Sequence, residues 1–127
     1  MAPSGRVVPS ERTPLHLAVL DGHEEVVKEL LEHGVEISTT DFKGRTALHL
    51  AAQGYSLGVL TLLLERGADM AARDGEGMTP LHFAYQKGVT RMIDCLIEKG
   101  ANKEAKAIYG VTPEMLHPLS AYRSFGR

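Results

Sequence analysis

The sequence has little of several features that mark particular classes of protein. Cys95 is the only cysteine among 127 residues, so no disulfide can form within the chain. A chain without disulfides fits a reducing compartment. No stretch approaches the ~20 apolar residues of a membrane-spanning helix, and residues 1–10 lack the apolar run of a secretory signal. We therefore expect a cytoplasmic or nuclear protein with no membrane partner.

An excess of positive charge is also missing, because the formal net charge is −2. Binding to nucleic acids generally needs a clustered basic face, so we expect no nucleic-acid partner. The charge is unevenly spread. Residues 1–40 hold seven acids against three bases, and residues from 99 onward hold five bases against two acids. These charges predict an acidic and a mildly basic end, and their simplest interpretation is a solvated surface.

Patterns for catalysis are absent as well. The sequence has no glycine-rich phosphate loop of the G-x-x-x-x-G-K-[ST] type, and no pair of carboxylates stands out. Cys95 lies beside the apolar stripe of an expected helix, where thiols behave as inert small hydrophobic groups. We expect no enzyme activity and no cofactor.

What the sequence does have is a short pattern at a fixed spacing. The pattern Thr-Pro/Ala-Leu-His begins at three threonines 33 residues apart, and Thr112 begins a fourth copy that soon fails. A second pattern keeps the same spacing and consists of two apolar residues, Glu, a basic residue and Gly. The first pattern starts at Thr13, Thr46 and Thr79, and the second ends at Gly34, Gly67 and Gly100. A fixed period of this length is typical of stacked-repeat proteins.

These patterns resemble the ankyrin repeat family, whose unit is two antiparallel helices and a β-turn or hairpin loop. The resemblance covers about residues 10–117. It implies an all-α fold, an α-solenoid of stacked helix-turn-helix repeats joined by β-hairpin-like loops. We expect an ankyrin repeat domain over 10–117, with full repeats at 10–40, 41–73 and 74–106, a partial repeat at 107–117, a disordered lead at 1–9 and a C-terminal tail at 118–127.

Local signals predict where the helices begin and end. Thr13 is an N-cap candidate, and Pro14 suits the first helical position. Gly34 ends the second helix, because glycine accepts the left-handed conformation. Apolar spacing predicts helices at about 24–32, 46–52, 80–87 and 90–99. We expect the stack to be faced by Leu15, Leu17 and Ala18 of the first helix and by Val26, Val27, Leu30 and Leu31 of the second.

Two repeats depart from the pattern. Gly54 stands one position earlier than Gly22 and Gly88, so we expect an altered turn without loss of register. Gly58 lies inside an expected helix, where it costs roughly 1 kcal/mol against alanine if exposed. Glu114 replaces a leucine in the partial repeat and suits an outward-facing cap over the last layer. The alternative is that the chain belongs to a longer array of repeats.

Recurring histidines raise the question of a metal site. His16, His49 and His82 stand one repeat apart, which is roughly 10 Å for packed helices, whereas metal ligands converge on one ion at about 2 Å. We therefore expect no metal. The resemblance implies that each histidine is a structural strut between its own threonine and the next repeat, which gives structural roles to Thr13, Thr46 and Thr79.

The resemblance also implies where a partner would bind. Partners of ankyrin proteins usually dock in the concave groove made by the hairpin tips and the exposed side of the first helices. Apolar side chains at a tip are not needed for packing, so they mark an interaction surface. We expect Phe42 and Tyr109 to be anchors, and the alternative is that Ile108 and Tyr109 merely fold over the last layer. Carried onto this sequence, the partner-binding positions are Phe42, Lys43, Arg45, Gln53, Glu76, Met78, Gln86, Lys87, Ile108 and Tyr109.

The expected function is therefore that of a non-catalytic, monomeric module that binds another protein or peptide. Lys43, Arg45 and Lys87 would give the groove a local positive character that steers the partner. The alternative hypothesis is a regulatory or targeting ankyrin segment of a larger enzyme or of a microbial effector.

Overall fold

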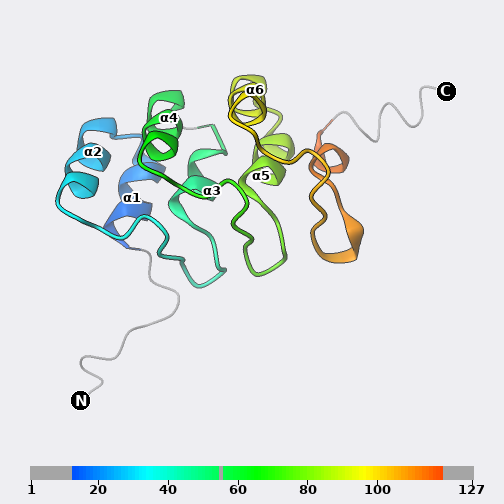
Figure 1. The fold of residues 1–127 in the computed structure, drawn as a ribbon, viewed down its shortest axis with the longest axis horizontal. Coiled ribbons are helices and arrows are strands. Elements are labelled where there is room, and N and C mark those ends of the chain that lie inside the picture. The colour runs from blue at the N-terminus through cyan, green and yellow to red at the C-terminus, as the bar shows by residue number, and fades with distance from the viewer. Residues whose placement is uncertain (1–12, 55, 119–127) are drawn as a thin grey trace, which may run out of the picture.

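A computed structural model describes residues 13–54 and 56–118, and within them the chain is helical. The helices stack in two rows, and the connecting loops project to one side as hairpin-like tips (Figure 1). This arrangement confirms the all-α solenoid. The helices are α1 (Pro14–Asp21), α2 (Glu24–Glu32), α3 (Ala47–Ala51), α4 (Leu57–Glu65), α5 (Pro80–Lys87) and α6 (Thr90–Glu98), followed by the 3₁₀ helices η1 (Ile108–Gly110) and η2 (Pro113–Leu116).

The ends of α1 follow from its sequence. Thr13 has an extended backbone, and its hydroxyl accepts a hydrogen bond from the His16 N–H, at 3.3 Å. Pro14 occupies the first position, where no intrahelical donor is lost. The helix stops at Gly22, whose φ of +72° is the left-handed conformation that favours glycine.

The turn after α3 differs, as expected from the earlier glycine. The helix has five residues, and the residue after it, Ala52, is right-handed rather than left-handed. Gly54 then takes a φ of +101°, and a Cβ at this position would lie 2.8 Å from the Val89 side chain. The shorter helix still packs on both α1 and α5. The register of the stack is therefore kept.

The core is a continuous strip between the layers. Leu48 of α3 and Leu60 and Leu63 of α4 are completely buried, and they belong to one apolar cluster that runs from α1 to α6. Burying a leucine contributes about 1.5–3 kcal/mol relative to leaving it exposed. The fold is thus held together by contacts between neighbouring repeats.

Two residues expected to face the stack do not. Leu17 on α1 and Val26 on α2 are both about half exposed. Their equivalents one repeat later, Leu50 and Val59, are buried because the first repeat covers them. The prediction for Leu17 and Val26 was wrong because helical periodicity identifies an apolar face without showing whether a neighbour is present to cover it.

The partial fourth repeat covers the other end. A short helix, η2, packs against α5, and its first residue, Pro113, is buried. The His117 ring meets the Tyr85 ring edge-on at 6.0 Å between centroids. Glu114 lies on the exposed side. Among the helices of residues 13–54 and 56–118, none is long and apolar enough to cross a membrane. The expected lead at 1–9 and most of the tail lie outside the described residues.

Candidate functional site

Three hairpin-like tips project from the stack, and each lies at the boundary between one repeat and the next. Each tip is five residues long and is closed by a backbone hydrogen bond from its first residue to its last. The N–H to carbonyl distances are 3.0 Å in tip 1 (41–45), 2.9 Å in tip 2 (74–78) and 2.7 Å in tip 3 (107–111). The backbone of each tip is therefore a closed turn rather than an open loop.

An aspartate fixes the first tip from inside. Asp41 Oδ1 accepts hydrogen bonds from the N–H groups of Lys43 and Arg45, both at 2.9 Å. Burial acts to raise the pKa of the Asp41 carboxyl, but these hydrogen bonds and the Arg45 guanidinium outweigh it. The pKa lies below its ordinary value, so the carboxylate is ionised at neutral pH. Asp74 holds tip 2 in the same way.

The tips are also bonded to one another. The Gly75 N–H donates to the Lys43 carbonyl at 2.8 Å, and the Ile108 N–H donates to the Glu76 carbonyl at 3.0 Å. The first contact is close, since a Cβ on Gly44 would lie 2.8 Å from the Gly75 nitrogen. These cross-links form what we call the tip ladder, which fixes the spacing of the three tips.

The recurring histidines connect each first helix to the following tip. The His49 Nδ1 accepts from the Thr46 N–H at 3.0 Å, and its Nε2–H donates to the Met78 carbonyl at 2.7 Å. Both ring nitrogens of a neutral imidazole are satisfied in this way. His16 and His82 make the corresponding bonds to the Arg45 and Val111 carbonyls, each at 2.8 Å.

The environment of the His49 and His82 rings favours their uncharged form. His49 and His82 are fully buried. Burial lowers the pKa of both rings below the ordinary value of a histidine, although the hydrogen bonds to backbone carbonyls act in the opposite direction. The Phe83 and His49 rings also pack in a T-shaped arrangement, at 5.1 Å between centroids. The rings are therefore occupied in holding the stack and turned away from solvent.

Several predicted partner-binding residues are at the surface of the tips. The exposed fractions are 50% for Phe42, 53% for Ile108 and 93% for Tyr109. The Lys43 ammonium lies 5.6 Å from the centroid of the Phe42 ring, within range of a cation–π interaction. Glu76, Gln86 and Lys87 are also exposed, and Gln53 is half-buried. We call Phe42, Lys43, Glu76, Ile108 and Tyr109 the tip surface.

Two other predicted residues serve the fold instead. The Arg45 guanidinium lies against the Asp41 carboxylate, with both nitrogen contacts at 2.9 Å and a side chain only 14% exposed. Its charge is largely compensated within tip 1. Met78 is half-buried and packs against the apolar core. Residue type at a tip position did not reveal that these side chains turn inward.

Tip 3 has a feature that sequence reasoning missed. Tyr109 has a φ of +64°, which among the described residues no other non-glycine residue shares. A side chain in this left-handed conformation costs roughly 1–2 kcal/mol. Tip 3 also has Ala107 where the other two tips have Asp41 and Asp74, so it lacks the carboxylate that fixes them. That substitution was the available signal that tip 3 is built differently.

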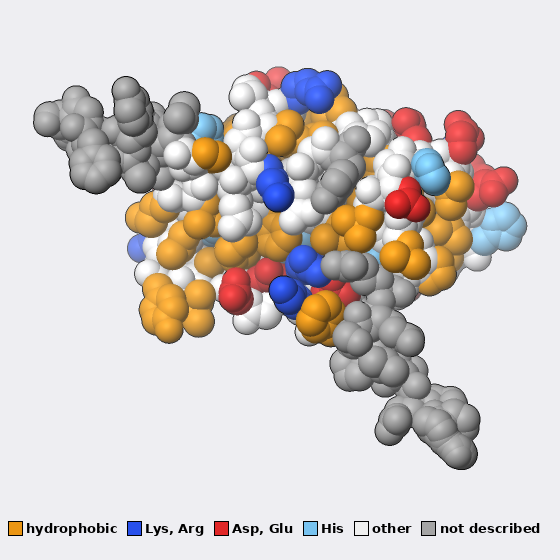
Figure 2. Space-filling view, turned by 180° about the vertical axis from the view of Figure 1, so that it is seen from behind, with side chains coloured by type: hydrophobic (Ala, Val, Ile, Leu, Met, Phe, Trp, Pro, Cys, Tyr) orange, Lys and Arg blue, Asp and Glu red, His pale blue; other side chains and the backbone are white. Residues whose placement is uncertain are grey.

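Viewed from behind, the edge of the molecule formed by the tips carries apolar, basic and acidic side chains close together (Figure 2). Further acidic side chains gather at the end formed by the first repeat. A partner that contacts the tips therefore meets apolar groups beside charges of both signs, since Lys43 and Glu76 are both exposed.

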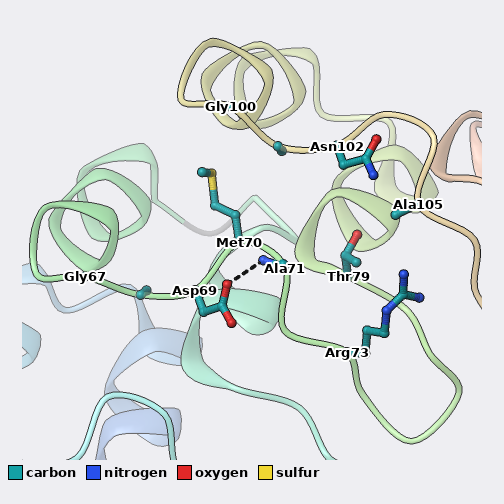
Figure 3. Close-up of a pocket in the computed structure, with 11 residues that line it drawn as sticks. Gly67, Asp69, Met70, Ala71, Arg73, Thr79, Gly100, Asn102 and Ala105 are labelled. Atoms are coloured by element: carbon teal, nitrogen blue, oxygen red, sulfur yellow. Dashed lines mark hydrogen bonds between the residues drawn. The ribbon is translucent and has the colours of Figure 1, made fainter.

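A crevice lies between two loops that follow second helices (Figure 3). It encloses about 540 Å³ between the segments 67–73 and 100–105. The Asp69 carboxylate accepts from the Ala71 N–H at 2.8 Å, and the Arg73 guanidinium donates to the Gly77 and Lys106 carbonyls. A smaller crevice of about 190 Å³ occupies the same place one repeat earlier. Both crevices are thus consequences of stacking.

Groups suited to metal binding do not converge in the part of the chain that the structure describes. No three His, Cys, Asp or Glu side chains within residues 13–54 and 56–118 are placed to hold a metal ion. Burial raises the pKa of the Cys95 thiol, which keeps it in the unreactive protonated form.

Two protein-family models match the chain, and together they cover most of the repeats described above. Residues 4–74 match a family model described as ankyrin repeats in three copies. Residues 56–97 match a second model, described as ankyrin repeats in many copies. The first match alone covers more than half of the chain. No curated protein matches the sequence.

Proposed function

Because the chain belongs to the ankyrin repeat family, whose repeats are generally protein–protein interaction modules, we propose that it binds a partner protein or peptide through the tip surface and the adjoining concave groove. The interaction is non-catalytic. The resemblance inferred from sequence is confirmed by the family match, and the particular surface is our proposal.

The observation that carries this proposal is the exposure of two aromatic rings on a rigid support. Phe42 and Tyr109 place apolar rings in solvent at the two ends of the tip ladder. Aromatic side chains of this kind dominate the energetics of many protein interfaces. Strained backbone of the kind seen at Tyr109 is concentrated at functional sites.

Charge on the tip surface defines the chemistry of the partner. Lys43 is exposed beside the Phe42 ring, Glu76 is exposed in tip 2, and Lys87 is exposed outside the tip surface, at the end of α5. Arg45 contributes little, because Asp41 neutralises it. The part of the tip surface around Phe42 therefore suits a partner segment that carries an apolar side chain next to an acidic one. Lys43 and Lys87 would act mainly on the rate of association and its dependence on salt.

Rigidity is the physical basis of the proposed affinity. The tips are closed by backbone hydrogen bonds, cross-linked by the tip ladder and tied to the helices by the histidines. A preorganised surface loses little conformational entropy on binding, so more of the contact free energy appears as affinity.

Capture of partners from a cell extract tests the proposal. The double variant Phe42→Ala/Tyr109→Ala should keep the melting temperature close to that of the unchanged chain, because both side chains are exposed. Its affinity for the captured partner should fall at least about tenfold, since loss of one interface hot spot costs about 2 kcal/mol or more. Affinity is measured by titration with the purified partner.

Met115→Ala is the matched control. This methionine is 60% exposed but lies in η2 and is not part of the tip surface. The control should bind as the unchanged chain does. Undiminished capture by the double variant, or an equal loss in the control, would contradict the tip surface as the binding site.

A further inference from the structure

The first repeat leaves an apolar face that the later repeats bury. Leu17 is 51% exposed, whereas Leu50 and Phe83 at the same position of the later repeats are 1% and 4% exposed. Val26 is 45% exposed, whereas Val59 and Met92 are 1% and 0% exposed. Leu30 is half-buried, and its equivalents Leu63 and Leu96 are completely buried. We call Leu17, Val26 and Leu30 the end face.

The later repeats show what shape of occupant the end face fits. In each of them the equivalent positions are covered by helices of the preceding repeat, as α1 covers α3 and α2 covers α4. The end face is therefore the side of a helix pair that packs against another helix. At the opposite end of the stack, η2 and His117 already lie against α5.

The surroundings of the end face are acidic. Asp21 stands one turn from Leu17 on α1, and Glu29 stands one turn from Val26 on α2, and both are exposed. Four of the nine residues of α2 are glutamates, against the single base Lys28. Red side chains gather at this end of the molecule in Figure 2. Two such faces would repel each other, which argues against pairing between copies of the chain.

We propose that the end face docks an amphipathic α-helix of a partner protein that carries lysine or arginine beside its apolar side. The apolar side of that helix covers Leu17, Val26 and Leu30, and its basic residues meet Asp21 and Glu29. The sequence of residues 1–12 does not have this pattern, because it places Pro3, Gly5 and Pro9 where helix-favouring residues would be needed. This surface is distinct from the tip surface, so each proposal stands or fails separately.

The test uses the full chain and a defined peptide probe. The probe is a fluorescent helix of about 15 residues, long enough to be partly helical alone, with leucines at i, i+3, i+4 and i+7 and lysines on the rest. Fluorescence anisotropy should show saturable binding. A peptide with glutamates in place of the lysines should bind at least about tenfold more weakly.

Substitutions distinguish apolar docking from mere attraction of opposite charges. Leu17→Asp/Val26→Asp should weaken binding of the lysine peptide at least tenfold, although it makes the end more acidic. Met115→Asp, at the other end of the stack, should leave binding unchanged. Because the substituted positions are half exposed, the variants should fold, which circular dichroism checks.

Three results would overturn the proposal. Equal or tighter binding by Leu17→Asp/Val26→Asp would show that the peptide is held by charge alone. Sedimentation showing a dimer that this variant dissociates would identify a second copy as the occupant. Stronger binding after deletion of residues 1–12 would identify that segment as the occupant.

Discussion

At the scale of single residues, two buried histidines and one exposed tyrosine differ most from what their types predict. Histidine is the side chain whose charge ordinarily changes near neutral pH. His49 is instead buried and hydrogen-bonded at both ring nitrogens in its neutral form. Tyr109 has the opposite character, since it is exposed and its backbone adopts a conformation that glycine prefers. The first residue stabilises the stack, and the second is tolerated at a cost.

Replacing His49 with alanine should lower the free energy of unfolding by about 1–3 kcal/mol, because the Thr46 N–H and the Met78 carbonyl lose their buried partner. Urea unfolding followed by circular dichroism measures the change. His33→Ala is the control, because this histidine is exposed and bonds only within its own helix end. A similar loss in both variants would argue against the role of His49 as a strut.

Replacing Tyr109 with glycine should raise the free energy of unfolding by roughly 0.5–1 kcal/mol, because glycine adopts a φ of +64° without steric cost. Lys43→Gly at the same position of tip 1 should not stabilise, since Lys43 does not have a positive φ. Thermal unfolding of the two variants compares them. Destabilisation by Tyr109→Gly would mean that the ring makes a stabilising contact despite its exposure.

At the scale of elements, helices and tips use glycine for different reasons. Gly58 lies in the interior of α4, where glycine only weakens the helix. Gly44 closes tip 1 with a φ of +79° and approaches the backbone of tip 2. The same residue type is thus dispensable in one element and required in the other.

Gly58→Ala should stabilise the chain by about 0.5–1 kcal/mol, the difference in helix propensity. The new Cβ meets only the end of the flexible Glu24 side chain, which is exposed and can move aside. Gly44→Ala should instead destabilise, because its Cβ would lie 2.8 Å from a fixed backbone nitrogen. Melting temperatures of the pair test the distinction, and equal signs for the two changes would refute it.

At the scale of the whole molecule, the two ends of the stack are unlike. The C-terminal end is covered by a short helix, whereas the first repeat leaves apolar residues exposed among acids. Stability resides in the interfaces between repeats, so groups that connect repeats affect the entire stack. The histidines are such groups, and their protonation therefore has a global effect.

Acidification from pH 7 to pH 5 should lower the free energy of unfolding. The pKa values of His49 and His82 are lower in the folded chain than the ordinary value of about 6.5. Below that pH the unfolded chain binds protons that the folded chain does not. The free energy of unfolding therefore falls by at most about 1.4 kcal/mol per pH unit for each ring. The Asp41 carboxyl does not contribute in this window, because its lowered pKa acts only below about pH 4.

Urea unfolding at half-unit steps of pH measures this effect. Ring signals of His49 and His82 in nuclear magnetic resonance spectra should stay in the neutral form as pH falls below 6.5. Stability that is flat or that rises on acidification would contradict the assignment of these rings as buried and neutral.

Much of the fold could be predicted from the sequence, because helix caps, turn glycines and the spacing of the repeat are local features of the sequence. Thr13, Pro14 and the glycines after α1 and α5, Gly22 and Gly88, determine where these helices begin and end through caps and allowed φ angles. The 33-residue spacing of the Thr-x-x-His pattern determined that the repeats stack. The candidate site was predicted less well, because only the positions of the tips follow from the repeat.

The tertiary structure alone decided which side chains remain available. Lys43 and Arg45 are both basic residues of tip 1, and the sequence does not distinguish their roles. In the folded tip the Asp41 carboxylate lies against Arg45, whereas Lys43 lies over the Phe42 ring. Leu17 and Leu50 share a motif, but among the described residues a preceding repeat covers Leu50 and leaves Leu17 half exposed. Burial and pairing depend on neighbours brought together from other repeats, and a local pattern carries no information about whether such a neighbour is present.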